Sequence, residues 1–90
     1  MANMLVQNIS GTSDNPPPRG YDSWLDFWAN KKGVMPSWCR RCGKLTKELV
    51  GAHVMKACGG NEWYIVPLCT SCNLTSGMFY VPEEDLIPVR

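Results

Sequence analysis

Two stretches in the middle of the chain have the pattern of a β-hairpin. Residues 63–68 (WYIVPL) are aromatic and β-branched, which predicts a strand. Gly59 and Gly60 precede this strand and predict the turn of the hairpin. In residues 47–55, polar and apolar side chains alternate, so that one face of a first strand carries Val50, Ala52 and Val54.

The best helical pattern lies in residues 21–32. Asp22 or Ser23 can cap its N-terminus, and Gly33 follows two lysines as a stop signal. We interpret the apolar stripe of this helix as core, because an aromatic stripe is more often buried than used for stacking. The stripe has the spacing i, i+3, i+4 and i+7, at Tyr21, Trp24, Leu25 and Trp28.

The remaining elements have weaker signals. Residues 4–9 predict a short edge strand, and the second cysteine pair is expected to open a short helix with Gly77 near its close. Thr70 or Ser71 is the expected cap of that helix. Residues 78–81 are apolar and either return to the sheet or pack on the core, whereas the acidic tail from residue 82 carries no signal.

Length and composition indicate one small domain. The chain has 90 residues, and residues 10–20 (SGTSDNPPPRG) are small, polar and proline-rich, as in a linker or a poorly ordered arm. We therefore assign residues 1–20 to a partly disordered N-terminal arm and residues 21–90 to the folded domain. A domain of this size usually needs a cross-link in addition to its hydrophobic core.

Five cysteines can supply that cross-link, as disulfides or as metal ligands. The N-terminus lacks the basic start and apolar run of a signal peptide, and no stretch is long enough to cross a membrane. We therefore expect a cytoplasmic protein without membrane contact, where Cys-x-x-Cys pairs are read as metal sites. Cys58 is the odd thiol, and we interpret it as a loop residue without a role.

The strongest motif consists of two Cys-x-x-Cys pairs, CRRCGK at residues 39–44 and CTSC at residues 69–72. Residues 43–68 between them are enough for one hairpin to fold back and bring both pairs to one ion. Four thiolates suit a closed tetrahedral Zn²⁺ site with a structural role, and an iron–thiolate centre or disulfides are the alternatives. The predicted ligands are Cys39, Cys42, Cys69 and Cys72.

Positive charge is concentrated near the first cysteine pair. The whole chain has a net charge of +1, but residues 31–56 contain seven lysines and arginines and one acid, Glu48. Such a patch can meet nucleic-acid phosphates, or it can be an ordinary solvated face. For a nucleic-acid complex, we expect phosphate contacts from Arg40, Arg41, Lys44 and Lys47.

The layout from residue 39 to about residue 77 resembles the HNH endonucleases, whose ββα-metal core is often fastened by two Cys-x-x-Cys pairs. The resemblance rests on CRRC, GAHV, a glycine turn and YIVPLCTSCN. It implies that His53 is the general base that activates water. It also implies that Asn73 is a ligand of a second divalent ion such as Mg²⁺, separate from the zinc.

The motif also departs from the family pattern. Ala52 stands where the family commonly has an aspartate ligand, Tyr64 replaces the middle asparagine, and the final helix lacks a basic residue. Three interpretations of His53 therefore compete. It is a catalytic base, a relic in a binding domain that lost the chemistry, or a histidine that steadies the hairpin or substitutes as a zinc ligand.

Together these features predict a small α+β protein, a zinc-stabilised ββα domain of HNH or treble-clef type with an additional N-terminal helix. The predicted function is an HNH-related zinc-binding domain that binds DNA, either as a metal-dependent endonuclease with a reduced active site or without catalysis. The alternative is a non-catalytic zinc-finger module with a protein partner. The pattern gives no prediction for the oligomeric state.

Overall fold

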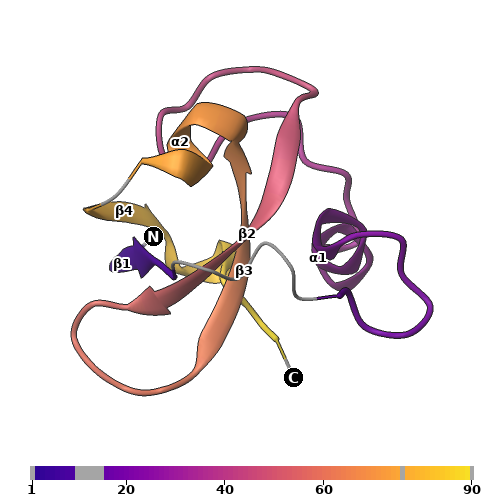
Figure 1. The fold of residues 1–90 in the computed structure, drawn as a ribbon. Helices are drawn as coiled ribbons and strands as arrows, with labels where there is room; N and C mark the ends of the chain where they lie inside the picture. The colour runs from indigo at the N-terminus through magenta and orange to yellow at the C-terminus, as the bar shows by residue number, and fades with distance from the viewer. Residues whose placement is uncertain (1, 10–15, 76, 90) are drawn as a thin grey trace.

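The computed structural model describes residues 2–9, 16–75 and 77–89, which form a small α+β domain (Figure 1). Within these residues, five strands form one antiparallel sheet in the order β4-β1-β2-β3-β5, accompanied by two α-helices. The elements are β1 (Asn3–Asn8), α1 (Trp24–Lys32), β2 (Leu49–Lys56), β3 (Trp63–Cys69), α2 (Thr70–Leu74), β4 (Met78–Pro82), the 3₁₀ helix η1 (Glu83–Asp85) and β5 (Ile87–Pro88).

Helix α1 begins three residues later than the sequence pattern suggests. Ser23 is the N-cap, and its hydroxyl accepts a hydrogen bond of 3.1 Å from the backbone N–H of Asp26. Gly33 ends the helix with a φ of 80°, a left-handed conformation that glycine adopts without strain. Of the predicted stripe, Trp28 is fully buried, and three residues are partly buried against the core: Tyr21, Trp24 and Leu25. Phe27, which is not in the stripe, is also buried.

The hairpin of β2 and β3 pairs over the full length of β3, with His53 opposite Ile65 and Val54 opposite Tyr64. Strand β1 also forms, but the prediction of an edge strand is wrong. It lies between β2 and β4, and its backbone bonds to both neighbours. Val6, at the centre of this strand, is fully buried in the core.

The C-terminal third contributes more than its sequence suggests. Residues 78–82 return to the sheet as β4, and the acidic tail contributes η1 and a short strand, β5. Helix α2 is shorter than expected: it ends at Leu74. Its N-cap is Cys69, without a side-chain hydrogen bond, and not Thr70 or Ser71. Residues 10–15 of the predicted arm lie outside the described residues.

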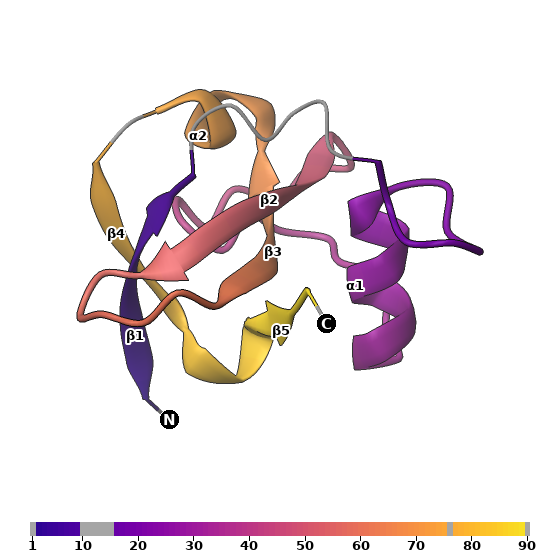
Figure 2. The same ribbon diagram turned by 60° about the horizontal axis from the view of Figure 1, so that its bottom comes forward.

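The sheet has apolar contacts on both faces. One face forms a core with the buried side chains of Val6, Val54, Leu68 and Phe79, into which Cys39 and Cys69 also pack. On the other face, Ile65 packs with Phe27 and Trp28 of α1. Figure 2 shows α1 and the β1–β4 pair on opposite sides of the β2–β3 hairpin.

Helix α1 approaches β2 closely at Gly51. A Cβ atom at this position would lie 2.6 Å from the backbone nitrogen of Leu25 and 2.8 Å from the Cβ of Trp24. These distances are shorter than ordinary carbon contacts, so only glycine fits. The first turn of α1 therefore lies directly against the strand, two residues from His53.

Candidate metal centre

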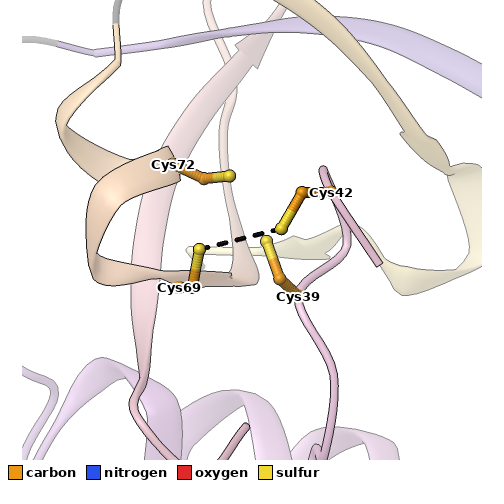
Figure 3. Close-up of side chains that lie close together, drawn as sticks. All are labelled: Cys39, Cys42, Cys69 and Cys72. Atoms are coloured by element: carbon orange, nitrogen blue, oxygen red, sulfur yellow. Dashed lines mark hydrogen bonds between the residues drawn. The ribbon is translucent and has the colours of Figure 1, made fainter. Parts of the chain in front are cut away.

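Four cysteines converge at one end of the sheet. Cys39 and Cys42 lie in the loop before β2, Cys69 ends β3, and Cys72 lies in α2. Their four sulfur atoms lie within 4.8 Å of one another and point toward a common centre (Figure 3). The Sγ atoms of Cys42 and Cys69 are 3.8 Å apart. The residues predicted from the two Cys-x-x-Cys pairs are therefore brought together as one candidate metal site.

The first pair is held by a tight turn of the type that the sequence indicates. Gly43 has a φ of 77°, and its N–H donates to the carbonyl of Cys39 at 2.9 Å. The N–H of Arg41 points at the Sγ atom of Cys39 over 3.4 Å. The N–H of Cys39 in turn donates to the carbonyl of Lys44 at 2.9 Å, which closes the turn. Backbone N–H groups directed at sulfur stabilise the thiolate form that binds metal.

The second pair is held in place by a side chain from β1. The amide nitrogen of Asn8 lies 3.3 Å from the carbonyl oxygen of Cys72, 3.4 Å from that of Asn73 and 3.0 Å from that of Thr75. These carbonyls lie at the C-terminal end of α2, where that of Cys72 also accepts the N–H of Thr75 at 3.2 Å. Asn8 therefore positions the helix turn that carries Cys72.

The pKa values of the thiols are shifted by this environment. Hydrogen bonding from the backbone N–H of Cys72 lowers the pKa of Cys69 to about 6. Burial raises the pKa of Cys39, but backbone hydrogen bonds, first from Cys42 and then from Cys69, outweigh it and lower the net value. Burial and the neighbouring thiols raise the pKa of Cys72. At neutral pH the cluster therefore already contains thiolate, which is the form that a metal ion binds.

The donor set fits a tetrahedral ion better than it fits a disulfide. A tetrahedron with metal–sulfur bonds of ~2.3 Å has sulfur atoms about 3.8 Å apart. The Cys42–Cys69 separation of 3.8 Å agrees with this value. A disulfide requires a sulfur–sulfur distance of about 2.05 Å, and the five cysteines are free thiols in this structure. The cluster can therefore hold a structural metal ion.

The fifth cysteine lies away from this cluster. Cys58 is exposed in the turn between β2 and β3, beside Gly59 and Gly60. Both glycines have positive φ values, which glycine adopts without strain, and they lie in the connection of residues 57–62 between the two strands. Cys58 is not among the four residues that could share one ion.

His53 has a different environment from the cysteines. Its side chain is only 6% exposed, and its ring meets the rings of Trp24 and Trp63 edge to face, at centroid distances of 4.7 and 5.9 Å. Its buried Nε2 atom has no hydrogen-bond partner among the described residues. Burial lowers the pKa of His53, so the imidazole is neutral at neutral pH.

The structure does not bring His53 and Asn73 together. His53 lies on the face that α1 covers, since its cross-strand partner Ile65 packs against that helix. Asn73 belongs to α2, and its carbonyl accepts a hydrogen bond from Asn8 of β1. Asn8 is paired with Val54 of β2, and the side chain of Val54 lies on the sheet face opposite to that of His53. Residues expected to share one catalytic site therefore lie on opposite sides of the sheet.

Arg40 is an internal residue and not a surface cation. Its side chain is 7% exposed, and its Nε atom donates to the carboxylate of Asp85 at 2.7 Å. The guanidinium group lies 3.7 Å from the ring centre of Trp38 and 5.2 Å from that of Trp28. Lys32 of α1 reaches the other oxygen of Asp85 at 3.0 Å. This network joins the first cysteine loop to α1 and η1.

The other three predicted phosphate contacts remain accessible to different degrees. Arg41 is half-buried: its guanidinium lies 4.5 Å from the ring centre of Phe79, and it donates to the carbonyl of Thr75 at 3.3 Å. Lys44 and Lys47 are exposed. The cationic surface beside the metal centre is therefore smaller than the sequence suggests.

Two residues that organise this region were not predicted. Asp85 lies in a run of three acids, and nothing in that run distinguishes the buried aspartate from its exposed neighbours. Asn8 had a detectable signal: it follows Met4 and Val6 at every second position, so it is a polar residue on the inward face of a strand. An inward polar residue needs a partner, here the end of α2.

Comparisons with known proteins give no family assignment. No protein-family model matches the chain, and no match was found among curated proteins or among solved structures. Among the described residues, no helix is long and apolar enough to cross a membrane. The functional argument therefore depends on the site itself.

Proposed function

We propose that the chain is a zinc-binding module in which one structural Zn²⁺ ion joins the two cysteine pairs. The observation that carries this proposal is the convergence of four sulfur atoms within 4.8 Å. Four protein thiolates complete the tetrahedron that zinc prefers and leave no position for water or substrate. The ion would then contribute to folding, since the free energy of zinc binding becomes folding free energy.

The module is, in this proposal, a non-catalytic relative of the HNH nucleases. The order of first cysteine pair, hairpin, second pair and α2 supports the relation, because it is the order that the sequence resemblance implies. A general base must reach water or substrate, whereas His53 is enclosed by Trp24, Trp63 and the first turn of α1. Its neutral, apolar surroundings support a packing role for the ring.

The proposed partner is the phosphate backbone of a nucleic acid, with DNA as the expected form. Lys44 and Lys47 are exposed on the loop that carries the first cysteine pair, and Arg41 lies on the same loop. The acid closest to them in the chain is Glu48, so the loop keeps a positive charge. Binding through such cations depends on salt and carries little sequence preference.

A protein-interaction module is the second candidate. It is favoured by apolar side chains exposed next to the first cysteine pair: Val34 is 56% exposed, Met35 62% and Leu45 79%. Large apolar side chains exposed to solvent are a common feature of protein-interaction surfaces when they lie together. In this alternative, the metal ion holds the loop that presents them.

Salt-dependent DNA binding distinguishes the two candidates. We expect the zinc-loaded chain to bind a labelled duplex at low salt in a fluorescence-anisotropy titration, with affinity that falls as salt rises. The double variant Lys44→Glu and Lys47→Glu should lose most of this binding. The matched control, Arg19→Glu with Lys56→Glu, changes the net charge by the same amount and should retain more DNA binding than the first double variant. Absence of binding at low salt, or equal losses in both variants, would favour the protein-interaction candidate.

A plasmid assay tests the absence of catalysis. We expect no nicking when the zinc-loaded protein is incubated with Mg²⁺ or Mn²⁺. Metal-dependent nicking that disappears in a folded His53→Ala variant would contradict the non-catalytic proposal. The zinc site itself would be unaffected by that outcome, because His53 lies outside the four-cysteine cluster.

A further inference from the structure

Strand β4 is an edge strand with an apolar outer face. Among the described residues, no strand pairs with it on the side away from β1. Phe79 and Val81 are buried in the core, at 7% and 1% exposure, whereas Met78 and Tyr80 are 59% and 62% exposed. The strand therefore presents apolar side chains to solvent at every second position.

The backbone N–H and C=O groups of β4 also point alternately toward β1 and toward the open edge. The N–H of Glu83 donates to the carbonyl of Ala2 at 3.0 Å, so every second residue counted from Glu83 bonds to β1. Positions 79 and 81 then direct their backbone groups toward β1, and positions 78 and 80 direct theirs toward the open edge. An open edge with N–H and C=O groups is a template for another strand.

The edge strand itself carries no charged side chain. β4 (Met78–Pro82) contains no lysine, arginine, aspartate or glutamate; the nearest charges are Arg41, 4.5 Å from the ring centre of Phe79, and Glu83, which follows the strand. Edge strands of monomeric proteins are commonly protected by charged side chains on the strand. When an antiparallel edge pairs with a copy of itself, each residue near the twofold axis meets its own kind, so an uncharged strand avoids like-charge repulsion. A charged partner strand would find no residue of opposite charge on β4.

We propose that two copies of this chain form a twofold dimer by antiparallel pairing of their β4 strands, centred on Tyr80. In this arrangement the N–H of Tyr80 donates to the C=O of Tyr80 of the second copy, and the reverse bond also forms. The N–H of Met78 donates to the C=O of Pro82 of the second copy. Pro82 has no N–H, so the pairing ends there.

The remaining edge makes a dimer the end point of this assembly. Strand β5, at the other side of the sheet, consists of two residues, Ile87 and Pro88. A strand so short that also contains a proline is a poor template for further pairing. Pairing through β4 is isologous and uses the same edge of both copies, so it closes without forming a filament.

Sedimentation velocity with the full zinc-loaded chain tests the dimer. The proposal predicts a concentration-dependent species of twice the monomer mass of 10.1 kDa. Tyr80→Lys places like charges opposite each other at the twofold axis and should weaken dimerisation about tenfold or more. Leu74→Lys also places a lysine at an exposed apolar residue, outside β4, and should leave the dimer intact. A wild-type chain that stays monomeric at millimolar concentration, or a dimer lost only in Leu74→Lys, would overturn the proposal.

Amide exchange of the wild-type chain gives an independent test that needs no variant. The N–H groups of Met78 and Tyr80 should gain protection as the protein concentration rises, since they bond only in the dimer. Those of Phe79 and Val81 should be protected at all concentrations, since they already face β1. Dimerisation without this alternating gain would show that another surface is used and would overturn the β4 pairing.

Discussion

The cysteine cluster and His53 lie on opposite sides of the β2–β3 hairpin and show two different uses of polar residues. At the cysteine cluster, four donors from two separate segments converge, and N–H groups and Asn8 support them. At His53, one polar ring is enclosed by tryptophans, and its buried nitrogen has no partner in the described residues. Convergence of several donors indicates a site, whereas a single motif residue does not.

The largest effect is expected from breaking the cluster. Cys42→Ser removes one ligand from an exposed residue, so it costs little packing, but it should release the metal and unfold the domain. The free energy at stake is on the order of 10 kcal/mol, which exceeds the stability of a domain this small. Dispersion of amide NMR signals is the measurement. Cys58→Ser, at an exposed cysteine outside the cluster, is the control and should remain folded with metal bound.

The next largest effect concerns the buried ion pair between Arg40 of the first cysteine loop and Asp85 of η1. Asp85→Ala leaves the buried guanidinium of Arg40 without its carboxylate, and removing one partner of a buried pair costs about 3–5 kcal/mol. Glu84→Ala, at the exposed neighbour, should change stability by less than about 0.5 kcal/mol. Urea denaturation of the zinc-loaded variants compares them. Equal stability of the two variants would show that the network contributes nothing to the fold.

A smaller effect is expected at the contact between α1 and β2. Gly51→Ala adds a Cβ 2.6 Å from the backbone of α1, and such overpacking costs about 1–3 kcal/mol. Amide exchange in α1 should increase, because the helix must move away from the strand. Gly60→Ala adds its Cβ to open space, at a turn with positive φ, and should leave exchange in α1 unchanged. Identical α1 protection in both variants would contradict the close approach.

The smallest effect concerns the pH dependence of stability. Burial lowers the pKa of His53 in the folded state, so the unfolded chain binds the proton more tightly. Stability should therefore be complete above the ordinary histidine pKa of ~6.5 and decrease as the pH falls below it. We expect the difference in unfolding free energy between the wild type and His53→Leu, both with excess zinc, to show this slope. A flat difference between pH 8 and 5 would contradict the assignment.

The local elements could be read from the sequence because their signals are local. The hairpin, the cap and stop of α1 and the two cysteine pairs depend on residues near each other in the chain. The four cysteines form one cluster because a single hairpin separates the pairs. The burial of Trp28 followed in the same way from the spacing of the stripe in α1, whereas that of Phe27 did not.

The features that were missed depend on contacts between distant parts of the chain. β1 is an interior strand only because residues 78–82 return to pair with it, and no local pattern records that pairing. Arg40 had the appearance of a surface cation because its partner, Asp85, is 45 residues away. His53 matched a catalytic motif, but its role depends on Trp24 and Trp63, which come from α1 and β3.

We propose that the four cysteines hold one structural zinc ion, and X-ray absorption at the zinc edge of the purified protein, with metal content measured on the same sample, observes its ligands. We expect one zinc per chain with four sulfur neighbours at about 2.3 Å and no nitrogen or oxygen in the shell. A mixed shell, or a folded protein that contains no metal, would contradict it.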